Sequence, residues 1–227
     1  NRGSCVKSFD GHAGKAVTSI VVVDGTTIVS GGEDERVCIW NIVEGTCGVQ
    51  IHVGSAVRAI SVIGRGDSIV ACGSENGDIN LYNRADGSHL EKLAGHTGPV
   101  LALAHGKEEN ILMSGGADGT VRLWNCLGAE LTATMQGHLD GVTSLSVGDD
   151  VVVSASKDGT IKMWSLVNGQ CVQSFKGHTG GVTSVSTLPA VNYIVSGSTD
   201  GTIRVWRKQG DCGAIIRCTQ EVNDSDV

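Results

Sequence analysis

Histidine, serine and aspartate recur together along this chain, and these three residue types form the nucleophilic centre of many hydrolases. In that chemistry the histidine takes the serine proton, and the aspartate holds the histidine in the required tautomer. The trio first occurs as His12, Ser30 and Asp34, and it occurs four times in all, each time followed by a tryptophan. Because catalysis needs one positioned set beside an oxyanion hole, repeated equal sets indicate a structural brace.

Each of these sets has the same order of histidine, serine, aspartate and tryptophan. Buried polar groups need hydrogen-bond partners, and a closed set of this kind would supply them. We therefore expect a structural role for all of them and no catalytic residue. The sets are His12, Ser30, Asp34 and Trp40; His96, Ser114, Asp118 and Trp124; His138, Ser154, Asp158 and Trp164; and His178, Ser196, Asp200 and Trp206.

The stretch that contains each aspartate is repeated nearly unchanged. Its copies are GADGTVRLW at 116–124, SKDGTIKMW at 156–164, STDGTIRVW at 198–206 and the looser GEDERVCIW at 32–40 and SENGDINLY at 74–82. The closing aromatic residues are 40 or 42 residues apart. Within each period, short apolar runs and an Asp-Gly hairpin dipeptide predict an antiparallel meander without a helix. One meander cannot bury both faces, whereas several in series can pack on each other around an axis.

The Gly-His dipeptides, serines, hairpin aspartates and tryptophans together resemble the WD40 repeat family, over nearly every residue from about 5 to 218. The resemblance implies an all-β WD40 β-propeller with five visible four-stranded antiparallel blades, and a hydrogen-bonded His-Ser-Asp-Trp set within each complete blade. Residues 1–218 are the expected propeller region. The repeats are expected at about 10–51, 52–93, 94–135, 136–175 and 176–218.

The second repeat departs from the pattern at every position of the set. Val53 stands for the histidine, Cys72 for the serine, Asn76 for the aspartate and Tyr82 for the tryptophan. The loss is chemically coherent, because a half-satisfied buried network costs more than none. We expect this blade to be the least stable.

Closure of the ring is open to two interpretations. CVKSFDGH at 5–12 matches CVQSFKGH at 171–178, so residues 4–9 are expected to form an extra outer strand. GAIIRC at 213–218 could serve the last blade, which leaves one outer strand too many for a simple ring. Since members of the family most often have seven blades, we expect part of a larger, seven-bladed propeller, with a closed five-blade ring as the alternative. Residues 219–227 are expected to be an acidic tail or linker.

The resemblance implies a binding module without catalysis, which contacts proteins or peptides on its top face. That face is formed by the turns before the first strand and between the second and third strands of each blade. Arg58 could pair with a carboxylate or phosphate of a partner, or it could be a solvated arginine. The candidate contact residues are Lys15, Glu33, Arg58, Glu75, Asp140, Lys157 and Thr199.

Composition excludes several other classes of function. The net charge of −7 argues against nucleic acid as the primary partner. No phosphate-binding loop, metal-ligand spacing or long apolar run occurs, so we expect no cofactor, metal, small-molecule substrate or membrane insertion. The eight cysteines and the absence of a visible signal peptide favour the cytoplasm, with the nucleus as the alternative.

The sequence thus predicts a non-enzymatic protein–protein interaction scaffold within a multiprotein complex. The alternative is the substrate- or target-recognition propeller of a larger regulatory protein, such as a ubiquitin-ligase subunit or a kinase. Because one fold serves many functions, the partner itself is not predicted.

Overall fold

The structure is a computed structural model that describes residues 4–64, 66, 68–106, 108, 110–148, 150–188, 192–209 and 212–217. The described residues form the strands β1 (Val17–Val22), β2 (Thr27–Gly32), β3 (Arg36–Asn41), β4 (Thr46–His52), β5 (Val57–Ile63), β6 (Ile69–Ser74), β7 (Ile79–Asn83), β8 (His89–Leu93), β9 (Val100–His105), β10 (Ile111–Gly116), β11 (Thr120–Asn125), β12 (Glu130–Gln136), β13 (Val142–Val147), β14 (Val151–Ser156), β15 (Ile161–Ser165), β16 (Cys171–Phe175), β17 (Val182–Leu188), β18 (Tyr193–Ser198), β19 (Thr202–Arg207) and β20 (Cys212–Arg217).

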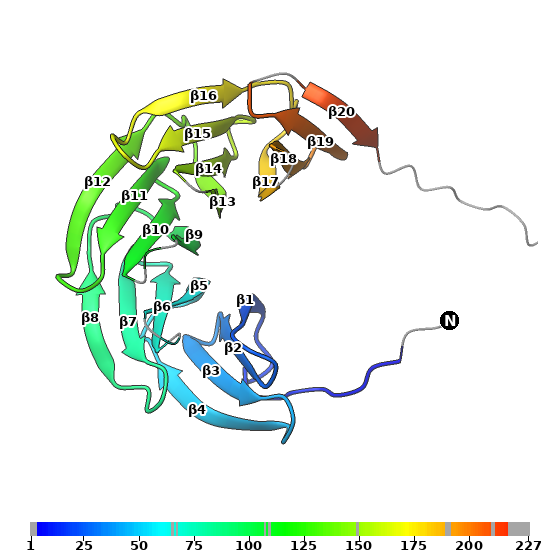
Figure 1. The fold of residues 1–227 in the computed structure, drawn as a ribbon. Helices are drawn as coiled ribbons and strands as arrows, with labels where there is room; N and C mark the ends of the chain where they lie inside the picture. Colours follow the sequence, from blue (N-terminus) through cyan, green and yellow to red (C-terminus); the bar gives the residue numbers. More distant parts are fainter. Residues whose placement is uncertain are drawn as a thin grey trace, which may run out of the picture.

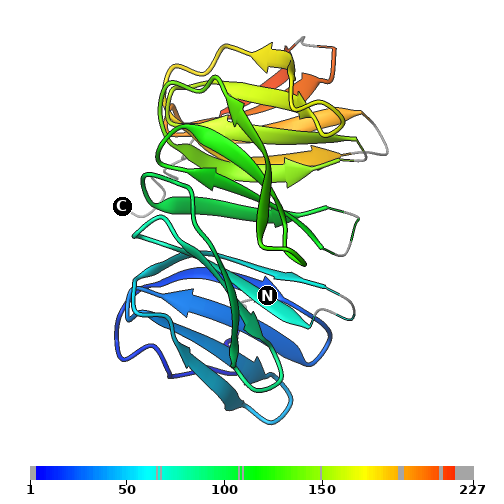
Figure 2. The same ribbon diagram turned by 90° about the vertical axis from the view of Figure 1, so that its left-hand side faces the viewer.

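Consecutive strands pair into five four-stranded antiparallel sheets, which we number as blades 1 to 5 in chain order. Blade 1 is β1–β4 and blade 5 is β17–β20. The blades fan around a common axis, with the first strand of each blade nearest the axis and the fourth on the outer rim (Figure 1). The side view shows the sheets stacked face to face (Figure 2). The expected all-β architecture with these blades is confirmed.

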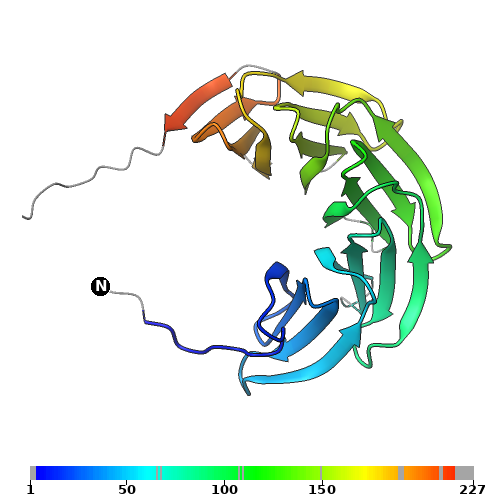
Figure 3. The same ribbon diagram turned by 180° about the vertical axis from the view of Figure 1, so that it is seen from behind.

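The blades form an open arc, because blade 1 and blade 5 lie on opposite sides of a gap (Figures 1 and 3). This structure is therefore not the closed five-blade ring that the sequence left as an alternative. Membership of a larger, seven-bladed propeller stays a prediction. The expected acidic tail at 219–227 lies outside the described residues.

Residues 4–10 form no strand, in contrast to the outer strand expected at 4–9. An outer strand needs the edge of a third strand to pair with, and no such edge lies beside this segment in the described structure. The segment is held by side chains instead. Lys7 Nζ donates to the carbonyls of Ile42 at 2.9 Å and Val43 at 2.8 Å, and Phe9 meets Trp40 edge-on at a centroid distance of 5.4 Å.

The apolar core lies between the blades rather than within any one of them. Each of the four buried clusters combines residues of two adjacent blades; Val29 of blade 1 and Val57 of blade 2, for example, share one cluster and are both fully buried. The second strands are therefore buried on both faces, whereas the outer strand β4 alternates between exposed and covered residues. This is why one repeat alone could not fold.

In every blade a β-bulge interrupts the hydrogen-bonded ladder between the first and second strands. One residue of the first strand has no partner across the ladder there, so its side chain can be directed toward the neighbouring blade. The unpaired residues are Thr18, Arg58, Leu101, Thr143 and Thr183.

Candidate functional site

The repeated His-Ser-Asp-Trp sets are positioned by the blade itself. In blade 4, His138 precedes β13, Ser154 lies on β14, Asp158 occupies the β14–β15 turn and Trp164 lies on β15. The turn requires Gly159, whose φ of 82° lies in the left-handed region. Strand pairing then brings four side chains that are distant in sequence into contact.

Hydrogen bonds run through the whole set in one direction. Trp164 Nε1 donates to Ser154 Oγ at 2.8 Å, so the serine proton is free to face His138 Nε2 at 2.7 Å. That nitrogen must then accept, which leaves the Nδ1 proton of His138 to be donated to Asp158 Oδ2 at 3.0 Å. The set is thus a continuous chain of hydrogen bonds from Trp164 through Ser154 and His138 to Asp158, in which the histidine is neutral.

The other complete blades have the same geometry. The histidine Nε2 to serine Oγ distances are 2.7 Å in blade 1, 2.7 Å in blade 3 and 2.8 Å in blade 5, and the tryptophan bonds are 2.8, 2.8 and 2.9 Å. The four serines are almost fully buried. The residues that the sequence grouped as Trp40, Ser30, His12 and Asp34, and their equivalents, are thus brought together in space.

Burial and hydrogen bonding set the charge states in these networks. Burial lowers the pKa of His96 and His138, although the carboxylates of Asp118 and Asp158 oppose the effect. For Asp158, burial raises the pKa, but bonds from the Leu139 amide, Thr160 and His138 outweigh it and bring the pKa to about 2. The aspartate is therefore ionised and the histidine neutral near pH 7.

The serine hydroxyls of these sets are not accessible in the way that a triad nucleophile is. Ser114 and Ser154 are fully buried, and each hydroxyl oxygen already accepts an indole N–H. A substrate carbonyl would have to reach an oxygen that has no exposed surface, beneath a tryptophan ring. The arrangement fixes the β-turn and the strand pair, and that is its physical effect.

The set in blade 1 is less complete than the others. The second carboxylate oxygen of Asp34 is buried without a hydrogen-bond partner among the described residues. The equivalent oxygen of Asp118 accepts the Thr97 amide at 3.1 Å, and Thr120 Oγ1 adds a bond of 2.8 Å to the other oxygen. In blade 1 the threonine position is Arg36, so this second bond is missing.

Blade 2 replaces the polar network with an apolar cluster. Cys72 is fully buried beside Tyr82 and Val53, and burial raises the pKa of both the Cys72 thiol and the Tyr82 phenol. Asn76 is exposed, and its Nδ2 donates to Asp78 Oδ2 at 2.9 Å. The position therefore contains no half-satisfied hydrogen-bonded set.

The candidate contact residues lie at the end of the blades where the first strand begins and the second strand ends. Six of them are exposed, and Arg58 is half-buried. Lys15 and Glu33 of blade 1 lie on neighbouring turns, joined by a bond of 3.0 Å from the Glu33 amide to the Ala16 carbonyl, and Asp140 and Lys157 of blade 4 are joined in the same way by the Lys157 amide and the Gly141 carbonyl at 3.0 Å. The set is Lys15, Glu33, Arg58, Glu75, Asp140, Lys157 and Thr199.

Arg58 is the centre of an ion-pair cluster that links two blades. Its Nε donates to Glu75 Oε2 at 2.5 Å within blade 2, and its Nη1 donates to Glu33 Oε1 at 3.1 Å in blade 1. These hydrogen bonds raise the pKa of Arg58. The guanidinium is therefore paired within the protein, and it occupies the bulge position where Thr18 and Thr143 bind backbone carbonyls of the next blade.

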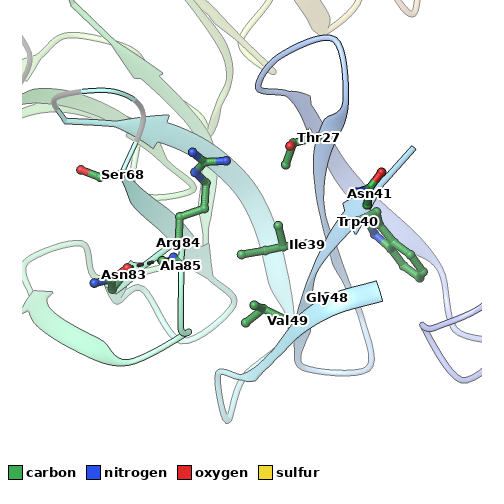
Figure 4. Close-up of a pocket in the computed structure, with 10 residues that line it drawn as sticks. All are labelled: Thr27, Ile39, Trp40, Asn41, Gly48, Val49, Ser68, Asn83, Arg84 and Ala85. Atoms are coloured by element: carbon green, nitrogen blue, oxygen red, sulfur yellow. Dashed lines mark hydrogen bonds between the residues drawn. The ribbon is translucent and has the colours of Figure 1, made fainter. Parts of the chain in front are cut away.

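A groove that the sequence did not suggest lies between blades 1 and 2, at the end opposite to the top face (Figure 4). Its volume is about 320 Å³, and its apolar wall contains Ile39 and Val49, with Arg84 at the rim. In the equivalent position blades 3 and 4 have the apolar Cys126 and Leu166, which join the apolar clusters. The signal available in the sequence was a charged residue, Arg84, at a position that is apolar in blades 1, 3 and 4 and is also charged in blade 5, as Lys208.

The described residues contain no group of three or more histidine, cysteine, aspartate or glutamate side chains arranged to hold a metal ion. None of the described segments is a helix with the length and apolar character needed to cross a membrane.

Comparison with known proteins gives a consistent set of relatives. The chain is 31% identical over 146 residues to SIR4-interacting protein SIF2 of Saccharomyces cerevisiae, 29% over 132 residues to telomerase protein component 1 of Rattus norvegicus, and 25% over 142 residues to mitochondrial division protein 1 of Vanderwaltozyma polyspora. These matches cover 57%, 57% and 63% of this chain, but only 27%, 5% and 17% of the relatives. The chain therefore spans about a quarter of the first relative and less of the other two.

The model of the WD domain, G-beta repeat, matches residues 3–41, 87–125, 129–165 and 169–207. These ranges together exceed half of the chain and include every complete His-Ser-Asp-Trp set, while the body of blade 2 is not matched. By its repeats, its blades and its hydrogen-bonded sets, the chain belongs to the WD40 family.

Proposed function

We propose that this chain is a non-enzymatic platform that holds protein partners within a multiprotein complex, and that its top face carries the contact surface. One observation supports the proposal most directly. The residue types that could do chemistry are buried in structural sets, while the exposed charges of the top face stand on turns braced by those sets. Rigid turns lose little conformational entropy on binding, which suits a recognition surface.

The ion-pair cluster changes the expected role of Arg58. Because Glu33 and Glu75 already pair with it, a partner carboxylate would compete with two internal ones. Lys15 and Lys157 are exposed and form no ion pair among the described residues. We therefore assign the attraction of an acidic partner surface to these two lysines, while Arg58 links blades 1 and 2 through its ion pairs.

A cross-linking pull-down from cell extract with matched charge variants tests the proposal. The double variant Lys15→Glu, Lys157→Glu reverses two charges on the top face. The double variant Arg84→Glu, Lys208→Glu makes the same change of charge at the opposite end of the blades. Circular dichroism first establishes that both variants keep the wild-type fold.

Loss of specific partners in the top-face variant alone supports the proposal. Loss only in the opposite-face variant would move the contact surface to the end of the blades that carries Arg84 and Lys208, and would overturn the assignment of the top face. If one protein is captured in stoichiometric amount through the top face, the target-recognition alternative gains over a general scaffold. Proteins that bind all forms equally would exclude these charges as the contacts.

A further inference from the structure

Each blade has, directly after its third strand, a residue whose amide donates to a carbonyl just before the second strand of the same blade. Five residues hold this equivalent position, with N to O distances of 2.7–3.2 Å: Ile42, Arg84, Cys126, Leu166 and Lys208. At two junctions the residue is apolar and fills the space between the blades. Cys126 belongs to the apolar cluster that contains Leu81 of blade 2, and Leu166 packs on the cluster that contains Leu123 of blade 3.

The junction between blades 1 and 2 has Arg84 in this position, and the apolar cluster there does not include it. Ile39 takes the place of Leu81 and Leu123 in the register of the third strands. It shares its cluster with Val57 of blade 2, so it lies on the face of blade 1 that packs on the next blade. The groove of about 320 Å³ in Figure 4 occupies the space that an apolar side chain fills at the other two junctions. Since an apolar cavity of about 150 Å³ holds benzene, this groove has room for an aliphatic side chain.

A glycine widens the groove along the outer strand. Gly48 is the bulge residue of β4, in the position where blades 2, 3 and 4 have Leu90, Thr132 and Val172. A Cβ on Gly48 would meet only the Ile39 carbonyl oxygen, at 3.8 Å, so the space beside it is open. Gly48 does not have a left-handed φ, so its backbone conformation does not require glycine. The effect of this glycine is therefore on the width of the groove.

Arg84 gives the groove its charge. Of the described residues that line it, Arg84 alone is charged, and its guanidinium forms no ion pair with another described residue. Asn41 and Asn83 use their side-chain oxygens to accept amides of their own turns, at 3.0 and 2.8 Å. Figure 4 shows Arg84 and Ile39 on opposite sides of the groove. A guanidinium opposite an apolar wall favours a ligand with both an aliphatic group and a carboxylate.

We propose that this groove binds an extended segment of a protein partner in which an aliphatic residue lies beside, or one residue away from, an aspartate or glutamate. The aliphatic side chain packs on Ile39 and Val49, as Cys126 and Leu166 pack at the other junctions. The carboxylate pairs with Arg84, whose planar guanidinium can bind it through two hydrogen bonds. The site lies at the opposite end of the blades from the top face, so it is a second contact region, independent of the proposed function.

Selection from a phage-displayed library of random peptides tests which segments bind. Each peptide is fused to the coat protein through its C-terminus, so a carboxylate in a selected peptide comes from a side chain. Phage that bind the Arg84→Leu variant are removed first, and the wild-type chain then captures the remainder. The enriched peptides should share the aliphatic and acidic pair. A selection that enriches no peptide, or only peptides without this pair, overturns the proposal.

Isothermal titration calorimetry with a selected peptide then separates the effects of shape and charge. Arg84→Leu supplies the apolar side chain that blade 4 has as Leu166, so it should lower the affinity about tenfold or more. Its thermal unfolding midpoint should equal or exceed that of the wild type, which excludes misfolding as the cause. Gly48→Leu keeps Arg84 but narrows the groove, and it should lower the affinity to a similar degree. Arg84→Lys keeps the positive charge and should weaken binding less than Arg84→Leu.

The chain offers two matched controls. Lys208→Leu makes the equivalent change in blade 5 and should leave the affinity for the peptide unchanged. The top-face variant Lys15→Glu, Lys157→Glu should also bind the peptide as the wild type does, so the result does not depend on whether the top face binds a partner. Equal affinities of the wild type and Arg84→Leu would overturn the proposal. Self-association of the wild type in sedimentation velocity that Arg84→Leu abolishes would assign the groove to a second copy of this chain, and would overturn it too.

Discussion

The hydroxyl of Ser154 accepts a hydrogen bond of 2.8 Å from the indole N–H of Trp164, and both residues are at most 2% exposed. The same hydroxyl also bonds His138 at 2.7 Å, so one buried oxygen satisfies two other buried groups. The Ser154 side chain therefore links β14 to Trp164 on β15 and to His138 before β13.

Replacing Ser154 with alanine should cost more stability than an ordinary surface change. Ser154→Ala leaves Trp164 Nε1 and His138 Nε2 buried without partners, which should cost about 2 kcal/mol or more. Guanidinium denaturation followed by tryptophan fluorescence measures the loss. As a control, Ser165→Ala at the last residue of β15 should remain within about 0.5 kcal/mol of the wild type. Equal values for the two variants would contradict a bracing role.

Blade 2 allows the reverse test. Cys72→Ser restores the serine of the complete sets, yet Val53 and Tyr82 supply neither the histidine nor the indole that would bind it. The hydroxyl would be buried unpaired, so we expect Cys72→Ser to be less stable than Cys72→Ala, by about 1 kcal/mol or more. A more stable serine variant in denaturant titrations would show that the blade can rebuild a partner.

Arg58→Thr should be tolerated although it removes an ion-pair cluster. Threonine in this bulge position binds the next blade's carbonyl in blades 1 and 4, and the Val100 carbonyl is the equivalent acceptor. The lost pairs are partly exposed and worth only about 0–1 kcal/mol. Thermal midpoints at low and high salt measure the exchange: the wild type should lose stability with salt, and the variant should not. Strong destabilisation of the variant would mean that the arginine is essential to the junction.

The stability of the fold should fall as the solution becomes acidic. Burial lowers the pKa of His96 and His138 below the ordinary 6.5, so the unfolded chain binds more protons than the folded one, and stability is lost as pH falls through 6.5. Asp118 and Asp158 have pKa values below the ordinary 3.8, and their contribution is lost as pH falls below that value. The thermal midpoint at pH 7.5, 5 and 3 should decrease in two stages. An unchanged midpoint between pH 7.5 and 5 would contradict the lowered pKa values of His96 and His138.

Local opening should begin at the ends of the arc. The sequence predicted blade 2 as the least stable, because its polar network is missing. In the structure blade 2 is covered by blades 1 and 3, whereas the end blades expose apolar residues such as Val17 and Ile203. Hydrogen exchange should therefore be faster in blades 1 and 5 than in β6. Faster exchange in β6 than in blades 1 and 5 would instead support the expectation from the sequence that blade 2 is the least stable.

Much of the architecture was readable from the residues alone. An Asp-Gly turn such as Asp158-Gly159 depends on local backbone conformation, and the 40–42-residue spacing of the aromatics reflects one meander per period. Both are properties of contiguous sequence. The pairing of His138 with Ser154 and Trp164 follows once the meander forms, so the sequence spacing is sufficient to group the members of each set.

The junctions between blades could not be read in this way. Arg58 was expected to meet a partner or solvent, but Glu33, from the neighbouring blade, is close enough to pair with it only because two separate sheets stack. Val17 and Val57 are the same residue in the same position of their blades, yet one is 54% exposed and the other fully buried. Turn chemistry and period are local and were determined by the sequence, whereas burial and charge pairing depend on which sheet covers which, and that was decided by the tertiary structure.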